Sequence, residues 1–194
     1  PTEWTVLKYL GSGSFGEVYS AHWQGATWAL KIQNQDPLRP FEEQSVYQEV
    51  QALQKFAKCP GIIHCAKVLV TPFNVQFLME LFDKDLRVCI ATLAQAGTPL
   101  KEDVASIFCN CVATGLHHMH AQGFVHRDLK PANILVKNQP LTAVISDLGA
   151  AKQGEGSKEC RTTRMYKAPE LFLGLGYKFA SDIWSLGLIC MEME

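Results

Sequence analysis

The chain has 194 residues, 47% of them hydrophobic, which is enough for one large domain or two smaller lobes with a real core. Its 18 Lys and Arg residues nearly balance 19 Asp and Glu residues, so the net charge of -1 provides no general attraction to nucleic acid or an acidic membrane. No apolar run approaches the ~18 residues that a membrane span needs, and no charged-then-apolar leader opens the sequence. We therefore expect a globular protein with no nucleic-acid partner and no membrane segment, by default intracellular in the cytoplasm or nucleus.

The seven cysteines form neither a CxxC pair nor a His-rich ligand spacing. Structural zinc sites usually show such closely spaced ligands, and small secreted disulfide frameworks usually have an even number of cysteines. We therefore predict reduced, buried thiols.

Alternation of apolar and polar residues in the first third of the chain is typical of short strands. After Pro37 and Pro40, apolar residues recur at helical spacing over 41–58, so one helix interrupts the strands. The predicted strands are 4–10, 16–23, 27–33, 67–71 and 76–81.

Helical periodicity dominates the rest of the chain, over 101–121 and from about 181 to the end. Strands followed by helices predict an α+β molecule with two lobes. The predicted parts are an N-lobe with an antiparallel sheet and one helix (1–81), a hinge (82–85) and a mainly helical C-lobe (86–194).

The stretch GSGSFGEV, residues 11–18, fits the pattern GxGxxGxV between two predicted strands. Glycines at such positions let backbone N–H groups approach phosphates closely, but by itself the motif fits a glycine-rich hairpin equally well. A dinucleotide-binding fold would need a helix directly after the glycines, and the residues that follow have strand character. The candidate nucleotide contacts are Gly11, Ser12, Gly13 and Gly16.

Residues 126–133, HRDLKPAN, match the catalytic-loop pattern HRDLKxxN without a mismatch. On this stretch and on the order of its motifs, the whole chain resembles the eukaryotic protein kinases, in particular the Ser/Thr class. The resemblance implies a two-lobed protein-kinase-like fold and ATP-dependent phosphorylation of Ser or Thr hydroxyls on protein substrates. It also implies ATP and Mg²⁺ as cofactors, and it allows an activating kinase or a regulatory subunit as a further partner.

By this resemblance, Asp128 accepts the proton of the substrate hydroxyl, and Lys130 adds a cation near the transferred phosphate. Asn133 and Asp147 are the expected Mg²⁺ ligands, Asp147 at the position of the DFG aspartate. Leu148 replaces the usual phenylalanine of that motif; it can fill an apolar slot, but it leaves open the balance between active and inactive loop positions.

Lys31 lies near the end of the third predicted strand, in the sequence Ala-Leu-Lys, which resembles the element whose lysine contacts the α- and β-phosphates of ATP. A single lysine in a strand usually lies at a sheet edge with its ammonium group in solvent. A partner of opposite charge is therefore needed to hold the side chain in place. Glu49, beside the apolar stripe of the predicted helix, is the expected partner. Glu42 and Glu43 are alternatives, although the helix dipole favours them as first-turn residues.

The resemblance also assigns an adenine site. Met79 would lie at its back, Glu80 and Phe82 would supply hinge backbone groups, and Asp85 would meet the ribose. Without the resemblance these are ordinary core residues and a solvated carboxylate. The residues expected to sandwich the adenine ring are Val18, Ala29 and Leu135.

The resemblance implies four further expectations for the catalytic loop and the segment after it. His126 should be a packed core histidine, and Asp182 should support the backbone of the loop. Arg127 should receive a phosphate added to the activation segment, with Ser157 and Thr162 as candidate acceptors. Thr163 should contact Asp128 or Lys130.

Residues 163–171, TRMYKAPEL, resemble the branch of cyclin-dependent, mitogen-activated and glycogen synthase kinases. That branch usually has arginine at the position of Lys167, and lysine cannot reproduce the fork of donors of a guanidinium, which weakens a prediction of proline-directed specificity. The family's domain continues beyond the helix in which this chain stops, so we expect an incomplete C-lobe and marginal stability for this piece alone. Glu170 should then lack its usual arginine partner and have an unsatisfied carboxylate.

Two rival interpretations stay open. A pseudokinase would keep the fold without turnover, and Leu148 weakly favours it, whereas the retained charged groups oppose it. A small-molecule kinase is disfavoured by the Ala-Pro-Glu activation segment, residues 168–170, which in protein kinases builds a platform for peptides.

Overall fold

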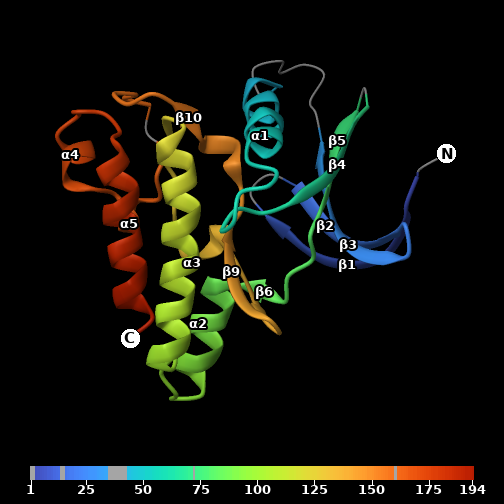
Figure 1. Ribbon diagram of the computed structural model, residues 1–194, viewed down its shortest axis with the longest axis horizontal. Coiled ribbons are helices and arrows are strands. Elements are labelled where there is room, and N and C mark those ends of the chain that lie inside the picture. The colour runs from blue at the N-terminus through green and yellow to red at the C-terminus, as the bar shows by residue number, and fades with distance from the viewer. Residues whose placement is uncertain (1–2, 14–15, 35–42, 72, 160) are drawn as a thin grey trace. The chain divides into compact units, whose positions relative to one another are not determined.

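The computed structural model covers the chain and describes residues 3–13, 16–34, 43–71, 73–159 and 161–194. These residues form two compact units (Figure 1). The first unit contains residues 1–57 and 63–82, and the second contains 58–62 and 83–194.

The first unit is built on an antiparallel sheet of five strands in the order β1-β2-β3-β5-β4, which confirms the predicted sheet. Gln24 and Gly25, with φ values of 47° and 79°, form the tight turn of the β2–β3 hairpin, where positive φ matches the strand twist. The strands are β1 (Thr5–Gly13), β2 (Gly16–Trp23), β3 (Ala26–Asn34), β4 (Cys65–Val70) and β5 (Asn74–Met79).

Apolar side chains cover one part of this sheet, where Trp4, Ala21, Leu30 and Leu78 form a buried cluster. The helix α1 (Glu43–Lys55) contacts β4. It ends before the predicted residue 58, and residues 41 and 42 of the prediction lie outside the described part. Its buried face has the helical spacing of three and four residues and consists of Glu49, Ala52, Leu53 and, just beyond the helix end, Phe56.

The second unit is mainly helical, as predicted. Its helices are α2 (Leu86–Gln95), α3 (Glu102–Ala121), α4 (Pro169–Phe172) and α5 (Phe179–Glu192), and α3 packs against both α5 and β9 (Figure 1). Its short strands are β6 (Lys84–Asp85), β7 (Phe124–Val125), β8 (Ile134–Asn138), β9 (Leu141–Ile145) and β10 (Lys152–Gln153). They form a β6-β8-β9 sheet and a β10-β7 pair. The single turns η1 (Pro131–Asn133) and η2 (Leu148–Ala150) lie between strands, and η3 (Arg164–Tyr166) lies between β10 and α4.

The helix α2 was not predicted from the sequence. Its β-branched residues Val88, Ile90 and Thr92 are weak helix formers. The helix begins because Asp85 caps it, with Asp85 Oδ1 accepting a 2.8 Å hydrogen bond from Val88 N. No helix among the described residues is both long and apolar enough to cross a bilayer.

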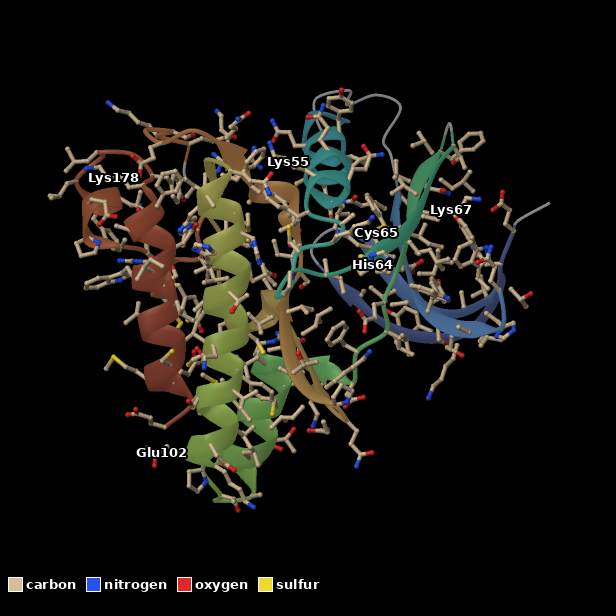
Figure 2. The ribbon with its side chains drawn as sticks, in the orientation of Figure 1. Lys55, His64, Cys65, Lys67, Glu102 and Lys178 are labelled. Atoms are coloured by element: carbon tan, nitrogen blue, oxygen red, sulfur yellow. The ribbon has the colours of Figure 1, made fainter. Side chains whose placement is uncertain are left out.

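The six cysteines in the described part of the chain are free and half-buried rather than fully buried as expected, and Cys160 lies outside that part. Burial raises the pKa of the Cys65 thiol to about 11, which keeps this group protonated at neutral pH. Cys65 lies at the start of β4, beside His64 (Figure 2).

Residues 58–62 belong to the second unit because their backbone packs directly on α3 and β9. Ile145 N donates to Gly61 O over 2.8 Å, and a Cβ on Gly61 would lie 2.4 Å from Cys111 O and 2.5 Å from Gly115 N. Gly115 allows the same approach from the helix side. Two glycines facing each other therefore set the distance between this segment and α3.

We predict that Gly61→Ala destabilises the full-length protein by more than about 3 kcal/mol, because backbone atoms cannot yield to the added methyl group. Gly97→Ala is the matched control: its φ of +63° imposes the same kind of strain as the +77° at Gly61, but no atom lies within 4 Å of its Cβ. Gly97→Ala should lower the free energy of unfolding by only about 1 kcal/mol. Urea denaturation measures both values, and equal losses would contradict the packing argument.

Candidate active site

Four of the predicted nucleotide-binding side chains, those of Val18, Ala29, Lys31 and Met79, share one face of the sheet in the first unit. Val18 of β2 is directly opposite Lys31 of β3, and Ala29 is two residues before Lys31, so all three side chains point to the same side. Phe77 and Met79 of β5 extend this face, opposite Lys31 and Ala29. These residues combine apolar side chains with the ammonium group of Lys31, which suits a ring and a phosphate chain.

Lys31 and Glu49 form the predicted ion pair, with Lys31 Nζ 2.7 Å from Glu49 Oε1. Their side chains are only 12% and 3% exposed, so removing one partner would leave a buried charge. Lys31 Nζ also lies 5.4 Å from the centroid of the Phe77 ring. The alternative partners Glu42 and the side chain of Glu43 lie outside the described part.

The glycine-rich loop is described at both of its ends. Gly11 and Ser12 belong to β1, which ends at Gly13, and Gly16 begins β2, while residues 14 and 15 lie outside the described part. A Cβ on Gly16 would lie 2.1 Å from Ile32 O. The close approach of β3 is therefore a structural reason for glycine at position 16, in addition to the phosphate contact that the motif predicts.

In the second unit, the Asp128 carboxylate accepts hydrogen bonds on both oxygens. Asp128 Oδ2 accepts from Lys130 Nζ at 2.7 Å and from Asn133 Nδ2 at 3.3 Å. Asp128 Oδ1 accepts from the backbone N and the Oγ1 of Thr163, at 3.0 and 3.2 Å. Lys130 Nζ also donates to Thr163 Oγ1, so the predicted contact of Thr163 with Asp128 or Lys130 is confirmed for both. The carboxylate is held in one orientation.

Two residues of this region have backbone conformations that are unusual for residues other than glycine. The φ of Arg127 is 70° and that of Asp147 is 56°. Such strain persists where surrounding contacts impose it, and it commonly occurs at functional sites. Directly after Asp147, Leu148 is fully buried, so it does fill an apolar slot.

The residues expected to bind Mg²⁺ fit a cation. Asp147 Oδ1 is buried and has no hydrogen-bond partner among the described residues, an arrangement that a cation would satisfy. Asn133 Nδ2 donates to the backbone O of Asp128 at 2.8 Å, which leaves the amide oxygen as the coordinating atom. The described residues contain no group of three His, Cys, Asp or Glu side chains that could hold a metal ion. Mg²⁺ suits such a sparse site, since it usually takes one or two carboxylates together with substrate phosphates.

The buried side chain of Asp182 supports the catalytic loop, as predicted. Its Oδ2 accepts from His126 N at 2.8 Å and its Oδ1 from Arg127 N at 3.0 Å. His126 is fully buried, as expected of a core histidine. His120, whose Nε2 lies 2.8 Å from Asp182 Oδ2, was not predicted as part of the site. Nothing in its pattern distinguished it from an ordinary histidine in the last turn of a helix.

Asp85 and Glu170 have partners that the sequence analysis did not foresee. Asp85 caps α2 and its Oδ2 lies 3.5 Å from Arg87 Nη2, so the expected ribose contact would compete with a structural role. Glu170 Oε1 accepts a 2.6 Å hydrogen bond from Ser181 Oγ, so the expectation of an unsatisfied carboxylate is wrong. The start of α5 supplies a partner that the motif alone did not reveal.

The remaining adenine-site residues are Glu80, Phe82 and Leu135. Glu80 N donates to His64 O at 2.9 Å at the end of the first unit. The boundary between the units follows Phe82. Leu135 is on β8 of the second unit, opposite Asp85. The adenine roles of these residues stay predictions.

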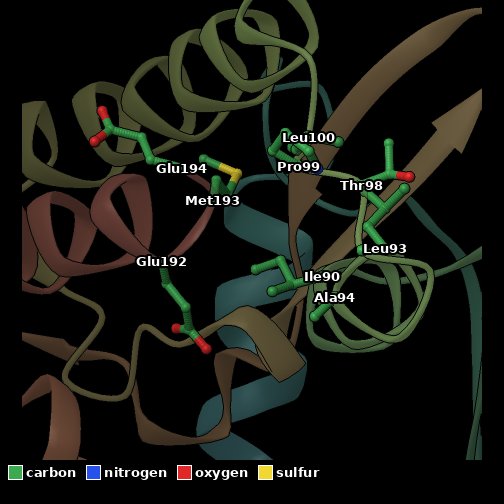
Figure 3. A pocket seen from close by; sticks show the side chains of 10 residues that line it. Ile90, Leu93, Ala94, Thr98, Pro99, Leu100, Glu192, Met193 and Glu194 are labelled. Atoms are coloured by element: carbon green, nitrogen blue, oxygen red, sulfur yellow. The ribbon is translucent and has the colours of Figure 1, made fainter.

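A separate cavity of about 200 Å³ lies in the second unit, between the end of α2 and the end of α5 (Figure 3). None of the predicted site residues lines it. Its walls are Ile90, Leu93, Ala94, Gly97, Thr98, Pro99, Leu100, Glu192, Met193 and Glu194.

The family model of the protein kinase domain matches residues 4–194 of this chain. The chain belongs to the protein kinase family. It is 34% identical to the sporulation protein kinase mde3 of Schizosaccharomyces pombe over 97% of this chain and 36% of that protein. It is 33% identical to the mitogen-activated protein kinase HOG1 of Alternaria brassicicola over 99% of this chain and 54% of that protein. It is also 33% identical to a probable CTD kinase subunit alpha homolog of Encephalitozoon cuniculi, over 98% and 57%.

The chain thus spans from about a third to just over half of the length of these relatives. Their names agree with the resemblance to the branch that contains the cyclin-dependent and mitogen-activated kinases.

We predict that Asp182→Asn destabilises the full-length protein by about 2–3 kcal/mol. The amide group of asparagine carries no negative charge, and it has one oxygen where the carboxylate has two to accept hydrogen bonds. Asp103→Asn makes the same chemical change at an exposed position at the start of α3 and should change stability by less than about 0.5 kcal/mol. Urea denaturation tests the difference, and equal unfolding midpoints for the two variants would refute it.

Proposed function

We propose that this chain is the catalytic domain of a protein Ser/Thr kinase, which transfers the γ-phosphate of ATP to a hydroxyl group of a protein substrate. The observation that carries the proposal is the Asp128 carboxylate, held on both oxygens by Lys130, Asn133 and Thr163. Phosphoryl transfer requires positioned charge more than covalent help from the protein, and this arrangement provides it.

Asp128 would orient the nucleophile. A substrate Ser or Thr hydroxyl that donates to this carboxylate has its oxygen directed at the γ-phosphorus, and its proton passes to Asp128 as the new P–O bond forms. The bond from the γ-phosphorus to the bridging oxygen breaks, and ADP leaves. Lys130, 2.7 Å from Asp128 Oδ2, would balance the negative charge of the transferred group.

Asp147 and Asn133 would hold Mg²⁺. When bound, the metal neutralises the charge of the β- and γ-phosphates. The buried and unpaired Oδ1 of Asp147 supports this role. The strained backbone at Asp147 directs the side chain for the same purpose.

Lys31 would contact the α- and β-phosphates of ATP. A lysine ammonium moves freely on its four-carbon stem, so it positions a phosphate well only when something holds it. Glu49 provides that restraint at 2.7 Å from a largely buried position. Val18 and Ala29, on the same face of the sheet, would contact the adenine ring, with Met79, Glu80, Phe82 and Leu135 as further contacts.

Lys130 supports the Ser/Thr preference, because kinases that resemble this chain and carry lysine at this position typically act on Ser or Thr. The mitogen-activated kinases among the relatives agree with it. Protein substrates follow from the peptide platform that the Ala-Pro-Glu segment builds in this family.

The first test is Mg²⁺-dependent transfer of labelled phosphate from ATP to a generic protein substrate by the full-length protein. Asp128→Asn should lower the rate about a hundredfold or more, because the variant cannot accept the proton. Asp103→Asn, the exposed control, should leave the rate unchanged. Absence of transfer by the unaltered protein, despite ATP binding, would instead favour a pseudokinase.

A second test concerns the metal ligand. Asp147→Asn should raise the concentration of divalent cation needed for half-maximal binding by at least about tenfold, since a charged ligand becomes neutral. Mn²⁺ can be used as the probe, followed by electron paramagnetic resonance with a non-hydrolysable ATP analogue bound. Unchanged Mn²⁺ affinity relative to Asp103→Asn would rule out this ligand.

A further inference from the structure

Arg127, next to the catalytic aspartate, is a buried cation. Its side chain is 2% exposed, and burial lowers the pKa of its guanidinium from the usual value. Its Nε donates to Ala150 O at 2.6 Å and its Nη1 to Ser157 Oγ at 3.0 Å. These acceptors are neutral, so they satisfy hydrogen bonds but do not balance the charge.

Glu159 supplies the negative charge. Its Oε2 lies 3.5 Å from Arg127 Nη1, while its Oε1 accepts from Arg161 Nε at 3.0 Å and also contacts Arg161 Nη2. One carboxylate therefore bridges two guanidinium groups. The hydrogen bond from Arg161 is the main reason why the pKa of Glu159 lies below its usual value, so the group is ionised at neutral pH.

The residues that follow Glu159 are held by Tyr177, a nearly buried residue for which the sequence contains no motif. Tyr177 OH accepts from the backbone N of Arg161 and of Thr162, both at 2.9 Å. Thr162 Oγ1 donates to Arg127 O. The Tyr177 ring centroid also lies 5.7 Å from the Arg127 guanidinium carbon, a cation–π distance.

These contacts lead directly to the catalytic group, because the next residue is Thr163, whose N and Oγ1 hold Asp128 Oδ1. The Glu159 carboxylate and the Tyr177 hydroxyl thus fix the chain immediately before the hydrogen bonds that orient Asp128. The geometry couples a charge on the activation segment to the position of the proton acceptor.

We propose that Glu159 is a positioning residue that takes the place of an added phosphoryl group: its carboxylate balances Arg127 and holds Arg161 to Thr163, so that Thr163 orients Asp128. The inference rests on the proposed function. It departs from the expectation that Arg127 receives a phosphate added to Ser157 or Thr162. A phosphate on Ser157 would meet the same Nη1 as Glu159, and one on Thr162 would break the contacts of Thr162 with Arg127 O and Tyr177 OH.

The experiment uses the full-length protein after phosphatase treatment, with mass spectrometry to show that the activation segment carries no phosphate. After this treatment, the protein without substitutions should retain transfer activity. Glu159→Gln should lower kcat about fivefold, with KM for ATP changing less than about twofold, because Glu159 is half-exposed and acts on Asp128 rather than on ATP. Glu159→Asp should recover part of the loss.

Glu102→Gln is the matched control, since Glu102 is an exposed carboxylate at the start of α3 (Figure 2). It should leave kcat unchanged. The inference is overturned if Glu159→Gln has the kcat of the unaltered protein, or if phosphatase treatment alone abolishes transfer, since the required anion would then be a phosphate.

Hydrogen exchange separates failure of this inference from failure of the proposed function. Glu159→Gln should speed the exchange of the Arg161 and Thr162 amides several-fold relative to Glu102→Gln, whether or not the protein transfers phosphate. If the unaltered protein shows no transfer but this exchange difference is present, the proposed function fails while the positioning contact stands. Equal exchange in the two variants overturns the inference.

Discussion

Two backbone amides of the catalytic loop, those of His126 and Arg127, point at one buried carboxylate, that of Asp182. A loop outside regular structure must find partners for its buried N–H groups, and an unpaired one costs about as much as a lost hydrogen bond. Asp182 meets this need from α5, and His120 from α3 shares the same carboxylate. These contacts maintain the positive φ of Arg127, and they thereby fix the position of the next residue, Asp128.

The same physical logic recurs at Lys31 and at Asp128. Glu49 on a helix holds Lys31 on a strand, and Thr163 and Lys130 hold Asp128. Glu49 and Thr163 each act from a different segment of the chain than the side chain that they restrain, whereas Lys130 belongs to the same loop as Asp128. Catalysis by positioned charge depends on such restraint, because a freely moving charge spends little time where the transition state needs it.

Much of this arrangement was predictable. The strand alternation located the five strands of the first unit to within a few residues, and the motifs selected Glu49, Asp182 and Thr163 as partners of Lys31, the catalytic loop and Asp128. The helix α2 was missed because its β-branched residues are weak helix formers. The N-cap at Asp85, which starts the helix, became apparent only in the structure. The expectation for Glu170 failed because Ser181, eleven positions later, supplies a hydrogen bond that no motif includes.

By itself, the sequence determined the family of this protein and its candidate site residues, because motif residues are close together along the chain and each motif needs particular side chains at particular spacings. Only the tertiary structure decided which distant residues complete them. His120, Glu159 and Tyr177 contact the catalytic loop and its neighbours across long stretches of chain. A histidine, a glutamate or a tyrosine is unremarkable in one sequence, and it becomes a positioning group only when folding removes water and places it against a buried charge or an unpaired amide.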